Sequence, residues 1–255
     1  MKRFLAALAV SLCLPALLPA QDSAPTHAPD FRAPQRIAPP DFPPVANAPF
    51  MADAKTTWVQ ILPDGSTVTR QNERVVARDM DGRLFQERRT FVPVPNPTTR
   101  QSTPYVNEFD DPVAHTRNIC IVATKTCNEF VYRPAIQTKD RPAGLQPGGR
   151  TFLTRESLGA DLVDGQEALH TRETLAVFSA TIGNTKNIIR SVDYWYSPKL
   201  GINLKVERHD PRDGDQTLWL TNLTLSAPEP SQFQVPSGYR IVDHRNPQAP
   251  SNGAQ

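Results

Sequence analysis

Apolar and polar residues alternate strictly through the stretch from residue 201 to residue 209. Its apolar positions are Ile202, Leu204 and Val206, and its polar positions are Asn203, Lys205 and Glu207. Successive side chains of a β-strand point to opposite faces of the sheet, so a period of two is typical of a strand with one buried face. Turn-forming residues lie on both sides of this stretch, and extended patterns continue beyond them. The pattern predicts three consecutive strands, at 188–196, 201–209 and 216–225.

The turns between these strands also predict how the strands pair. The first turn places Tyr194 opposite Leu204 and Val192 opposite Val206, and the second turn places Trp219 beside Val206. One apolar face then collects the residues Val192, Tyr194, Tyr196, Ile202, Leu204, Val206, Trp219 and Leu223. If a second layer covers this face, it is core. If the face is open, it is a groove for an apolar ligand, with these candidate binding residues: Val192, Tyr194, Tyr196, Leu204, Val206 and Trp219.

Short extended segments separated by turns fill most of the chain from residue 55 to residue 243. Asp64-Gly65 and Asp81-Gly82 lie between extended stretches, and Asp-Gly in that setting is a strong hairpin signal. Prolines outnumber glycines by 26 to 12, and helix-forming stretches are almost absent, apart from a single turn at 155–158. We therefore predict an all-β fold with very little helix, an antiparallel meander of about nine to eleven strands that forms a curved sheet, half-barrel or sandwich.

The chain divides into four predicted segments. Residues 1–20 combine Lys2-Arg3, an apolar run and Ala20, the pattern of a secretory signal peptide, so the protein is expected to be periplasmic or secreted. Residues 21–54 contain eight prolines and few large apolar residues, which predicts a disordered tether or, alternatively, a proline-rich ligand for a partner. Residues 55–243 form a single β domain, and residues 244–255 a disordered tail.

Cys120 and Cys127 are the only cysteines that remain once the signal peptide is removed. They lie on two short predicted strands joined by a turn at Ala123-Thr124, so the two side chains face one another. An even pair of cysteines in an exported protein predicts a disulfide. A reactive redox pair is the alternative, but the spacing is not Cys-x-x-Cys. Two cysteines without a nearby pair of histidines also make a poor zinc site.

The charge balance of the mature chain argues against two classes of partner. Without Lys2 and Arg3, 26 basic residues (28 minus 2) stand against 26 acidic residues. A net charge near zero gives no reason to expect nucleic acid or an anionic membrane as partner. No stretch after the signal peptide is apolar over a membrane-spanning length, so no integral membrane span is predicted. The strands near the N-terminus carry arginines that form either a solvated face or an anion-binding surface: Arg70, Arg74, Arg78, Arg83, Arg88 and Arg89.

Residues able to carry chemistry are scattered and match no catalytic or nucleotide-binding motif. His170 and His209 lie on different predicted strands, and each needs carboxylates from outside its own turn to act as a general base. The turn at 210–215 holds three aspartates that are candidates for calcium, but their spacing is not that of an EF-hand loop, and aspartates are common in tight turns. We predict no catalytic residues, no metal site and no cofactor.

The C-terminal part of the domain reads WYSPKLGINLKVERHDPRDGDQTLWLTNLTLSAPEPSQFQVPSGYRI. The order of a strand, a D-P-R turn, a strand, T-N-L and then E-P-x-x-x-F-x-V-P-x-G-Y resembles a group of uncharacterised exported proteins of acidobacterial type, and this likeness covers residues 55 to 243. The last quarter of the chain is more distantly similar to periplasmic lipoprotein-carrier (LolA-like) domains, whose curved antiparallel sheet closes with an F-x-x-P-x-G segment. Residues 229–239 have two prolines and no continuous pattern, which predicts an extended terminal segment that pins Phe233, Val235 and Tyr239 onto the sheet edge or core. Neither resemblance brings a catalytic motif.

Three functions remain open on these grounds. The favoured hypothesis is a non-catalytic exported protein that acts as a binding or scaffold module at the cell envelope, with an envelope protein or an apolar ligand as partner. The alternative is a LolA-like carrier that holds a lipid or another apolar ligand on the open face of the sheet. LolA-like domains use helices as a lid, however, and this chain has almost no helix-forming stretch. The third hypothesis is a hydrolase without a recognisable motif.

Overall fold

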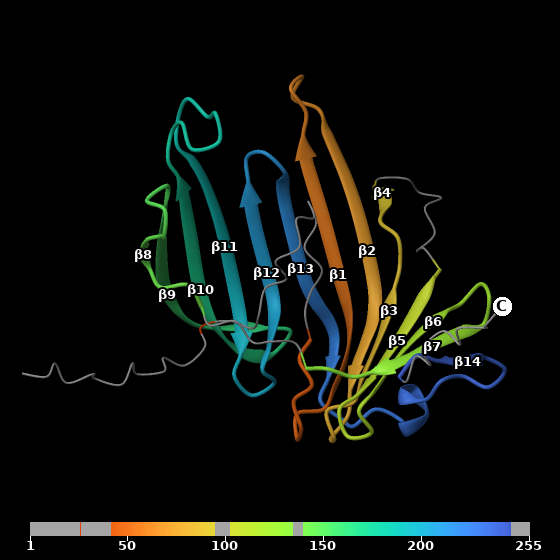
Figure 1. The fold of residues 1–255 in the computed structure, drawn as a ribbon. Helices are drawn as coiled ribbons and strands as arrows, with labels where there is room; N and C mark the ends of the chain where they lie inside the picture. The colour runs from red at the N-terminus through yellow and green to blue at the C-terminus, as the bar shows by residue number, and fades with distance from the viewer. Residues whose placement is uncertain (1–25, 27–41, 95–102, 135–139, 246–255) are drawn as a thin grey trace, which may run out of the picture.

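The structure, a computed structural model, describes residue 26 and residues 42–94, 103–134 and 140–245. They form fourteen strands in one sheet (Figure 1): β1 (Phe50–Ile61), β2 (Thr67–Arg78), β3 (Leu84–Arg88), β4 (Val92–Val94), β5 (Val106–Asp111), β6 (Thr116–Ile121), β7 (Thr126–Val131), β8 (Gly144–Leu145), β9 (Thr151–Val163), β10 (Gln166–Val177), β11 (Ile188–Ser197), β12 (Ile202–Asp210), β13 (Gly214–Thr224) and β14 (Arg240–Asp243). One short 3-10 helix, η1 (Pro230–Phe233), precedes β14. The predicted all-β fold is confirmed. The strand number exceeds the prediction because strands as short as β4 and β8 show no alternation.

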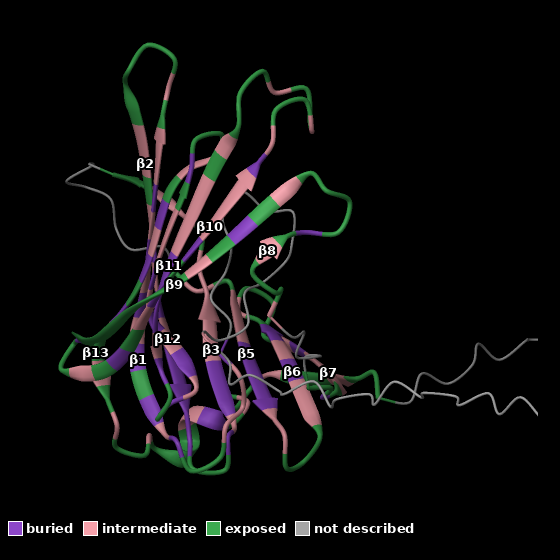
Figure 2. Cartoon of the chain, turned by 90° about the vertical axis from the view of Figure 1, so that its left-hand side faces the viewer, coloured by how far each residue is buried: buried purple, intermediate pink, exposed green. Residues whose placement is uncertain are grey.

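The two halves of the chain meet in the middle of the sheet. Its strand order is β14-β7-β6-β5-β3-β2-β1-β13-β12-β11-β10-β9-β8, with β4 paired to β2. The pairing of β1 with β13 joins the N-terminal strands to the C-terminal meander, and every strand pair except β14–β7 is antiparallel. Both ends of the sheet bend toward one side, which creates a concave and a convex face (Figure 2). The sheet is open, with β8 and β14 at its two edges.

Several predicted segments lie outside the described residues. These are the signal peptide (1–20), the remainder of the proline-rich segment up to residue 41 apart from Thr26, and residues 246–255 of the predicted tail. Within the described part of the chain, no helix is long and apolar enough to cross a membrane.

The predicted meander is present as β11, β12 and β13, but the pairing of its first two strands differs from the prediction. Tyr194 lies opposite Val206 instead of Leu204. Ser197 instead of Tyr196 lies opposite Ile202, which shifts the pairing by one residue, and a β-bulge between Trp195 and Tyr196 shifts it by a second. The shift is two residues at Tyr194, and because a strand has a period of two, Tyr194, Leu204 and Val206 stay on one face.

The pairing of β12 with β13 is also shifted, here by one residue. Val206 lies opposite Leu218, and Lys205 lies opposite Trp219. The turn closes at Gly214, which adopts a φ of 89°, so that the strand begins before the predicted position. A slip of one residue moves every side chain to the other face. The prediction that Trp219 belongs to the apolar face is therefore wrong, and this side chain lies on the convex face.

The segment before β1 belongs to the folded domain, which begins before the predicted boundary at residue 55. β1 starts at Phe50, and Phe42 packs near it in the concave core, with ring centroids 6.1 Å apart. Arg78 is fully buried and ties this segment down. Its guanidinium donates to three carbonyl oxygens, those of Pro43 (2.8 Å), Ala48 (2.8 Å) and Leu200 (2.5 Å). Residues 42–54 are therefore ordered by contacts that their proline content does not reveal.

A second apolar cluster lies on the convex face of the N-terminal strands. Val76 belongs to the concave core and its neighbour Ala77 to this second cluster, because adjacent residues of a strand face opposite ways. The other buried members are Phe85, Phe109, Cys120, Cys127 and Phe233. The two cysteines lie opposite each other on β6 and β7 and form the predicted disulfide. Phe233, Val235 and Tyr239 pack on this cluster, which confirms the predicted docking of the C-terminal segment.

Candidate functional site

The apolar face that the sequence predicts as either core or groove is largely core. Tyr194, Leu204 and Val206 are exposed by only 2%, 0% and 1%. They share one cluster with Phe42 and Ala48 from the segment before β1, so the chain itself covers them. Val192 is half-buried and packs at the margin of the same cluster. A ligand therefore has no access to this part of the concave face in the present conformation. Whether these residues contact a ligand in another state stays a prediction.

The remaining two predicted ligand-binding residues lie elsewhere. Tyr196 is half-buried and lies opposite Asn203, beyond the bulge, and burial raises the pKa of its hydroxyl. Trp219 is 46% exposed on the convex face. The ammonium group of Lys205 lies 5.8 Å from the Trp219 ring and 4.3 Å from the Trp195 ring. These contacts form a cation–π row across neighbouring strands.

The same convex row continues to His170 and explains why Trp195 is buried. The imidazole of His170 stacks on the Trp195 indole, with ring centroids 4.1 Å apart. Indole Nε1 of Trp195 donates to the carboxylate of Asp161 at 2.9 Å, and this hydrogen bond holds the pKa of Asp161 below its usual value. The distal end of the β9–β10 hairpin thus folds back over the convex face. A second contact fixes it there, because the backbone N–H of Leu223 donates to Asp164 at 3.0 Å.

Two histidine–carboxylate pairs bear on the hydrolase hypothesis. His170 Nε2 lies 2.8 Å from Asp193, and His209 Nδ1 lies 2.5 Å from Asp215. Asp193 also accepts a hydrogen bond from Arg172 at 3.0 Å. Within the described residues, neither histidine hydrogen-bonds a serine or cysteine. Activation of a serine or cysteine nucleophile needs such a contact, so both pairs are better explained as hydrogen bonds that cross-link adjacent strands.

Two of the aspartates in the β12–β13 turn, Asp210 and Asp215, pair with basic side chains and do not converge on a common cation. Asp210 pairs with Arg212 at 2.8 Å and with Arg190 at 2.6 Å. Asp215 pairs with His209, as described above. Among the described residues, no group of three His, Cys, Asp or Glu side chains could hold a metal ion. The calcium alternative therefore has no support in the geometry of this turn.

Three of the arginines named for the N-terminal strands, Arg83, Arg88 and Arg89, form ion pairs with acidic side chains. The buried carboxylate of Glu108 accepts hydrogen bonds from Arg88 at 2.7 Å and 3.0 Å, and Arg117 lies 3.7 Å away. Arg89 pairs with Glu87 at 2.8 Å. Burial, and then repulsion by Arg88, lower the pKa of Arg74 to about 10. This network is a satisfied strand face, which does not favour the alternative of an anion-binding surface.

The feature that the sequence did not reveal is the outer edge of β9. β8 pairs with β9 only at Phe152 and Leu153, so no described strand pairs with the outer side of residues 154–163. Leu158 and Leu162 on this stretch are 40% and 66% exposed. The predicted helical turn at 155–158 is wrong, because these residues belong to β9. The available signal was the Asp164-Gly165 turn, which makes the residues on its two sides hairpin partners.

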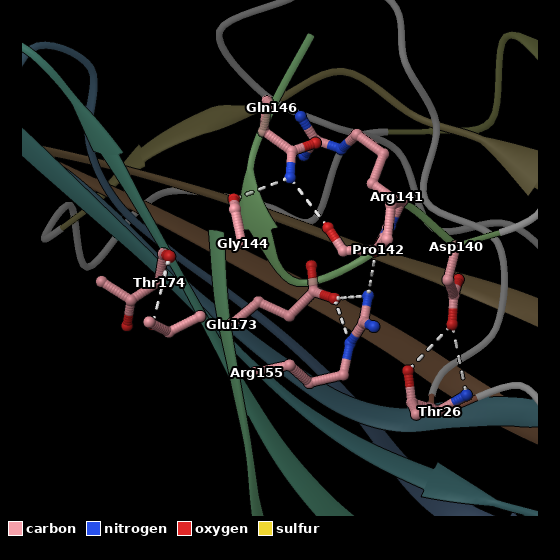
Figure 3. A network of polar contacts seen from close by, with 10 residues as sticks. Thr26, Asp140, Arg141, Pro142, Gly144, Gln146, Arg155, Glu173 and Thr174 are labelled. Carbon is pink, nitrogen blue, oxygen red and sulfur yellow. Dashed lines mark hydrogen bonds and ion pairs between the residues drawn. The ribbon is translucent and has the colours of Figure 1, made fainter. Parts of the chain in front are cut away.

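Polar contacts fix the segment that leads into β8 at the upper end of this edge (Figure 3). Arg155 pairs with the buried carboxylate of Glu173 and also donates to the carbonyl oxygen of Arg141 at 3.1 Å. The amide of Gln146 donates to two carbonyl oxygens, those of Pro142 (2.8 Å) and Gly144 (3.1 Å). β8 is thus an extended segment already docked on the β9 edge.

No protein-family model matches this sequence, and no curated protein does. Among solved structures, an uncharacterised conserved protein from Thermus thermophilus is similar with a TM-score of 0.39 and 10% identity, over 77% of this chain and 91% of that one. MucB, in the MucA/MucB complex of Pseudomonas aeruginosa, gives 0.35 and 14%, over 73% and 55%. A LolA superfamily protein from Nitrosomonas europaea gives 0.27 and 8%, over 74% and 91%.

These similarities concern the fold alone. The chain spans only 55% of the MucB structure. A LolA superfamily protein is among the similar structures, as the resemblance of the C-terminal part implies. The likeness to exported proteins of acidobacterial type stays a prediction. With such low scores, function has to be argued from the residues of this chain.

Proposed function

We propose that this protein is a non-catalytic exported binding module of the cell envelope and that its partner is another protein. The location rests on the predicted signal peptide. The observation that carries the proposal is the distribution of apolar side chains. The apolar side chains of the concave core are buried by the chain itself, whereas exposed leucines lie along the stretch of β9 that β8 leaves unpaired. Exposed apolar side chains beside an open sheet edge are typical of protein-binding surfaces.

The carrier alternative requires a rearrangement that the contacts oppose. A lipid chain on Leu204 and Val206 would have to displace the segment that contains Phe42 and Ala48. That displacement would leave the guanidinium of Arg78 buried without the carbonyl oxygens of Pro43 and Ala48. Unsatisfied buried polar groups cost about 1–3 kcal/mol each, and more when they are charged. The closed arrangement therefore favours a partner that binds outside the core.

Native mass spectrometry after cross-linking of the envelope tests this function. Envelope preparations are treated with an amine-reactive cross-linker, and the protein is purified without detergent from treated and untreated samples. We expect the untreated protein to show its bare mass, two hydrogens light for the disulfide. The treated sample is expected to contain a discrete conjugate with another polypeptide. A non-covalent excess mass that disappears on denaturation, with no conjugate, would instead establish the carrier.

A further inference from the structure

We propose that the outer edge of β9, from Thr154 to Val163, binds an extended segment of the partner polypeptide as an added β-strand. This inference rests on the proposed function and specifies its site. The partner segment would continue the ladder that β8 begins at Phe152 and Leu153. Its chemistry would be apolar residues alternating with lysine or arginine.

The outer edge of β9 is long enough to pair with a full strand. Residues 154–163 pair with β10 on one side, and within the described chain no strand occupies their other side. At about 3.3 Å per residue, this stretch offers roughly 33 Å of backbone, the length of a long strand. Main-chain N–H and C=O groups along an open edge bind an added strand with little regard to its sequence. β8 shows that an extended segment already fits this edge.

The side chains along the edge favour the binding of an added strand. Natural sheets protect open edges with proline, charged side chains, bulges or short strands. Residues 154–163 contain no proline, and although they carry Glu156, Asp161 and a bulge, Leu158 and Leu162 are exposed there. Leu169 on the adjacent strand is also exposed and lies opposite Ala160. An added strand with apolar residues at alternate positions would cover these leucines, and this burial would add affinity beyond the main-chain hydrogen bonds.

The charge of the β9–β10 hairpin indicates the kind of partner segment. The exposed acidic residues of the β9–β10 hairpin are Glu156, Asp161, Asp164 and Glu167. The guanidinium of Arg155 is taken up by Glu173, and that of Arg172 by Asp193. The hairpin therefore carries a net negative charge, although Asp161 and Asp164 also accept hydrogen bonds from Trp195 and from the backbone of Leu223. This charge attracts a basic segment and disfavours pairing with a second copy of the same hairpin. A bulge between Ser157 and Gly159 lies in the middle of the edge, and a bound strand would have to follow it.

Two matched double variants test the site. Leu158→Lys with Leu162→Lys places two positive charges on the β9 edge, where they repel a basic strand and remove the apolar contacts. Ile61→Lys with Ile182→Lys makes the same chemical change at two exposed residues on other elements. All four positions are exposed, so circular dichroism and thermal unfolding should show that both variants fold like the wild type.

The probe is a phage-displayed library of random peptides about ten residues long, the length of one long strand. We expect selection on the wild-type protein to enrich basic–apolar alternating peptides. Their affinity should fall at least about tenfold for the β9 variant and stay unchanged for the control. Amide hydrogen exchange should slow in residues 154–163 when such a peptide binds. Enrichment of no peptide, or equal binding to both variants, would overturn the proposed edge site.

The cross-linking experiment separates this inference from the proposed function. If the conjugate forms with the control variant and not with the β9 variant, both stand. If it forms equally with both, the protein is a binding module that uses another surface, and the edge proposal fails alone. If size-exclusion chromatography with light scattering shows a dimer that only the β9 variant loses, the edge binds a second copy and the proposed occupant is wrong.

Discussion

At the scale of single residues, Arg78 is the residue on which the closed concave face depends. It is fully buried, its guanidinium lies 4.9 Å from the Phe50 ring centroid, and it donates to three carbonyl oxygens from two distant segments. Burial lowers its pKa to about 10, so it still carries its charge at neutral pH. Its five donors in a planar fork suit several acceptors at once, which the single ammonium of lysine does not.

We expect Arg78→Met to lower the free energy of unfolding by roughly 3–5 kcal/mol, because three buried carbonyl oxygens lose their donor. Arg78→Lys should lie between this variant and the wild type. Urea unfolding followed by tryptophan fluorescence measures the difference. Arg133→Met, at an exposed arginine, is the control and should stay within about 0.5 kcal/mol of the wild type. Equal stability of the Arg78→Met and Arg133→Met variants would show that Arg78 does not hold the segment.

Asp210 makes the stability of the β12–β13 turn depend on pH. Burial alone raises the pKa of its carboxyl, but hydrogen bonds from Arg212 and the charges of Arg190 and Arg212 outweigh burial, and the pKa lies below its ordinary value of 3.8. A depressed folded-state pKa contributes stability above the unfolded-state pKa, and this contribution is lost as the pH falls through the folded-state value.

Asp210→Asn should therefore cost about 1–3 kcal/mol at pH 7, the usual range for a partly buried charged hydrogen bond. The difference from the wild type should shrink as the pH falls below 3.8. Unfolding free energies measured by urea titration from pH 7 to pH 2.5 give the two curves. Parallel curves over this range would mean that Asp210 is not the group that titrates.

At the scale of elements, Gly65 and Gly214 lie in turns for two different physical reasons. Gly214 and Gly65 both end hairpin turns with positive φ, 89° and 83°. A Cβ at Gly214 would lie 2.2 Å from the carbonyl oxygen of Val59, because β13 approaches β1 closely there, whereas a Cβ at Gly65 would meet nothing within 4 Å. Positive φ costs a residue with a side chain about 1–2 kcal/mol, so Gly65→Ala reports the conformational cost alone.

We expect Gly65→Ala to cost about 1–2 kcal/mol and Gly214→Ala roughly 3 kcal/mol or more, since the β1–β13 pairing must also shift. Thermal and urea unfolding measure both. Similar losses for the two variants would contradict a close approach of β13 to β1 at this point.

Local signals explain which elements were predictable. Strict alternation from Ile202 to Val206 predicted β12, and the Asp-Gly pairs marked true hairpin turns. The predicted register failed at a bulge and at the closing residues of both turns, because neither leaves a trace in the alternation. The face of Trp219 depended on that register and was therefore wrong. The cysteine pair succeeded because two short strands joined by a tight turn admit few arrangements.

At the scale of the whole molecule, the missing information is non-local. Nothing in residues 50–61 indicates that β1 pairs with β13 at the far end of the chain. The candidate site has the same origin, since β9 lies next to the end of the sheet and, among the described strands, only β8 pairs with its outer side, at Phe152 and Leu153. A strand pattern shows which face is apolar, but not which strand is last in the sheet. The edge, and with it the proposed binding site, therefore follows from topology.

The same topology predicts that the chain stays assembled when it is cut between β7 and β8. One piece would carry β1 to β7 and the other β8 to β14. The contacts that join the two pieces are the whole β1–β13 ladder, the β7–β14 pairing, the hydrogen bond from Arg78 to Leu200 and the packing of Phe233 in the convex cluster. The disulfide Cys120–Cys127 lies within the first piece, so it does not link the two covalently.

A site-specific protease sequence inserted within residues 135–139 allows the test. After complete cleavage we expect native mass spectrometry to show one species, heavier than the uncut chain only by the one water that hydrolysis adds, and two fragments only after denaturation. A mixture of separate fragments in native buffer would mean that the β1–β13 seam is too weak to join the halves. Retention of both fragments would instead show that the sheet is one cooperative unit, in which the β9 edge rests on a scaffold that extends across the whole molecule.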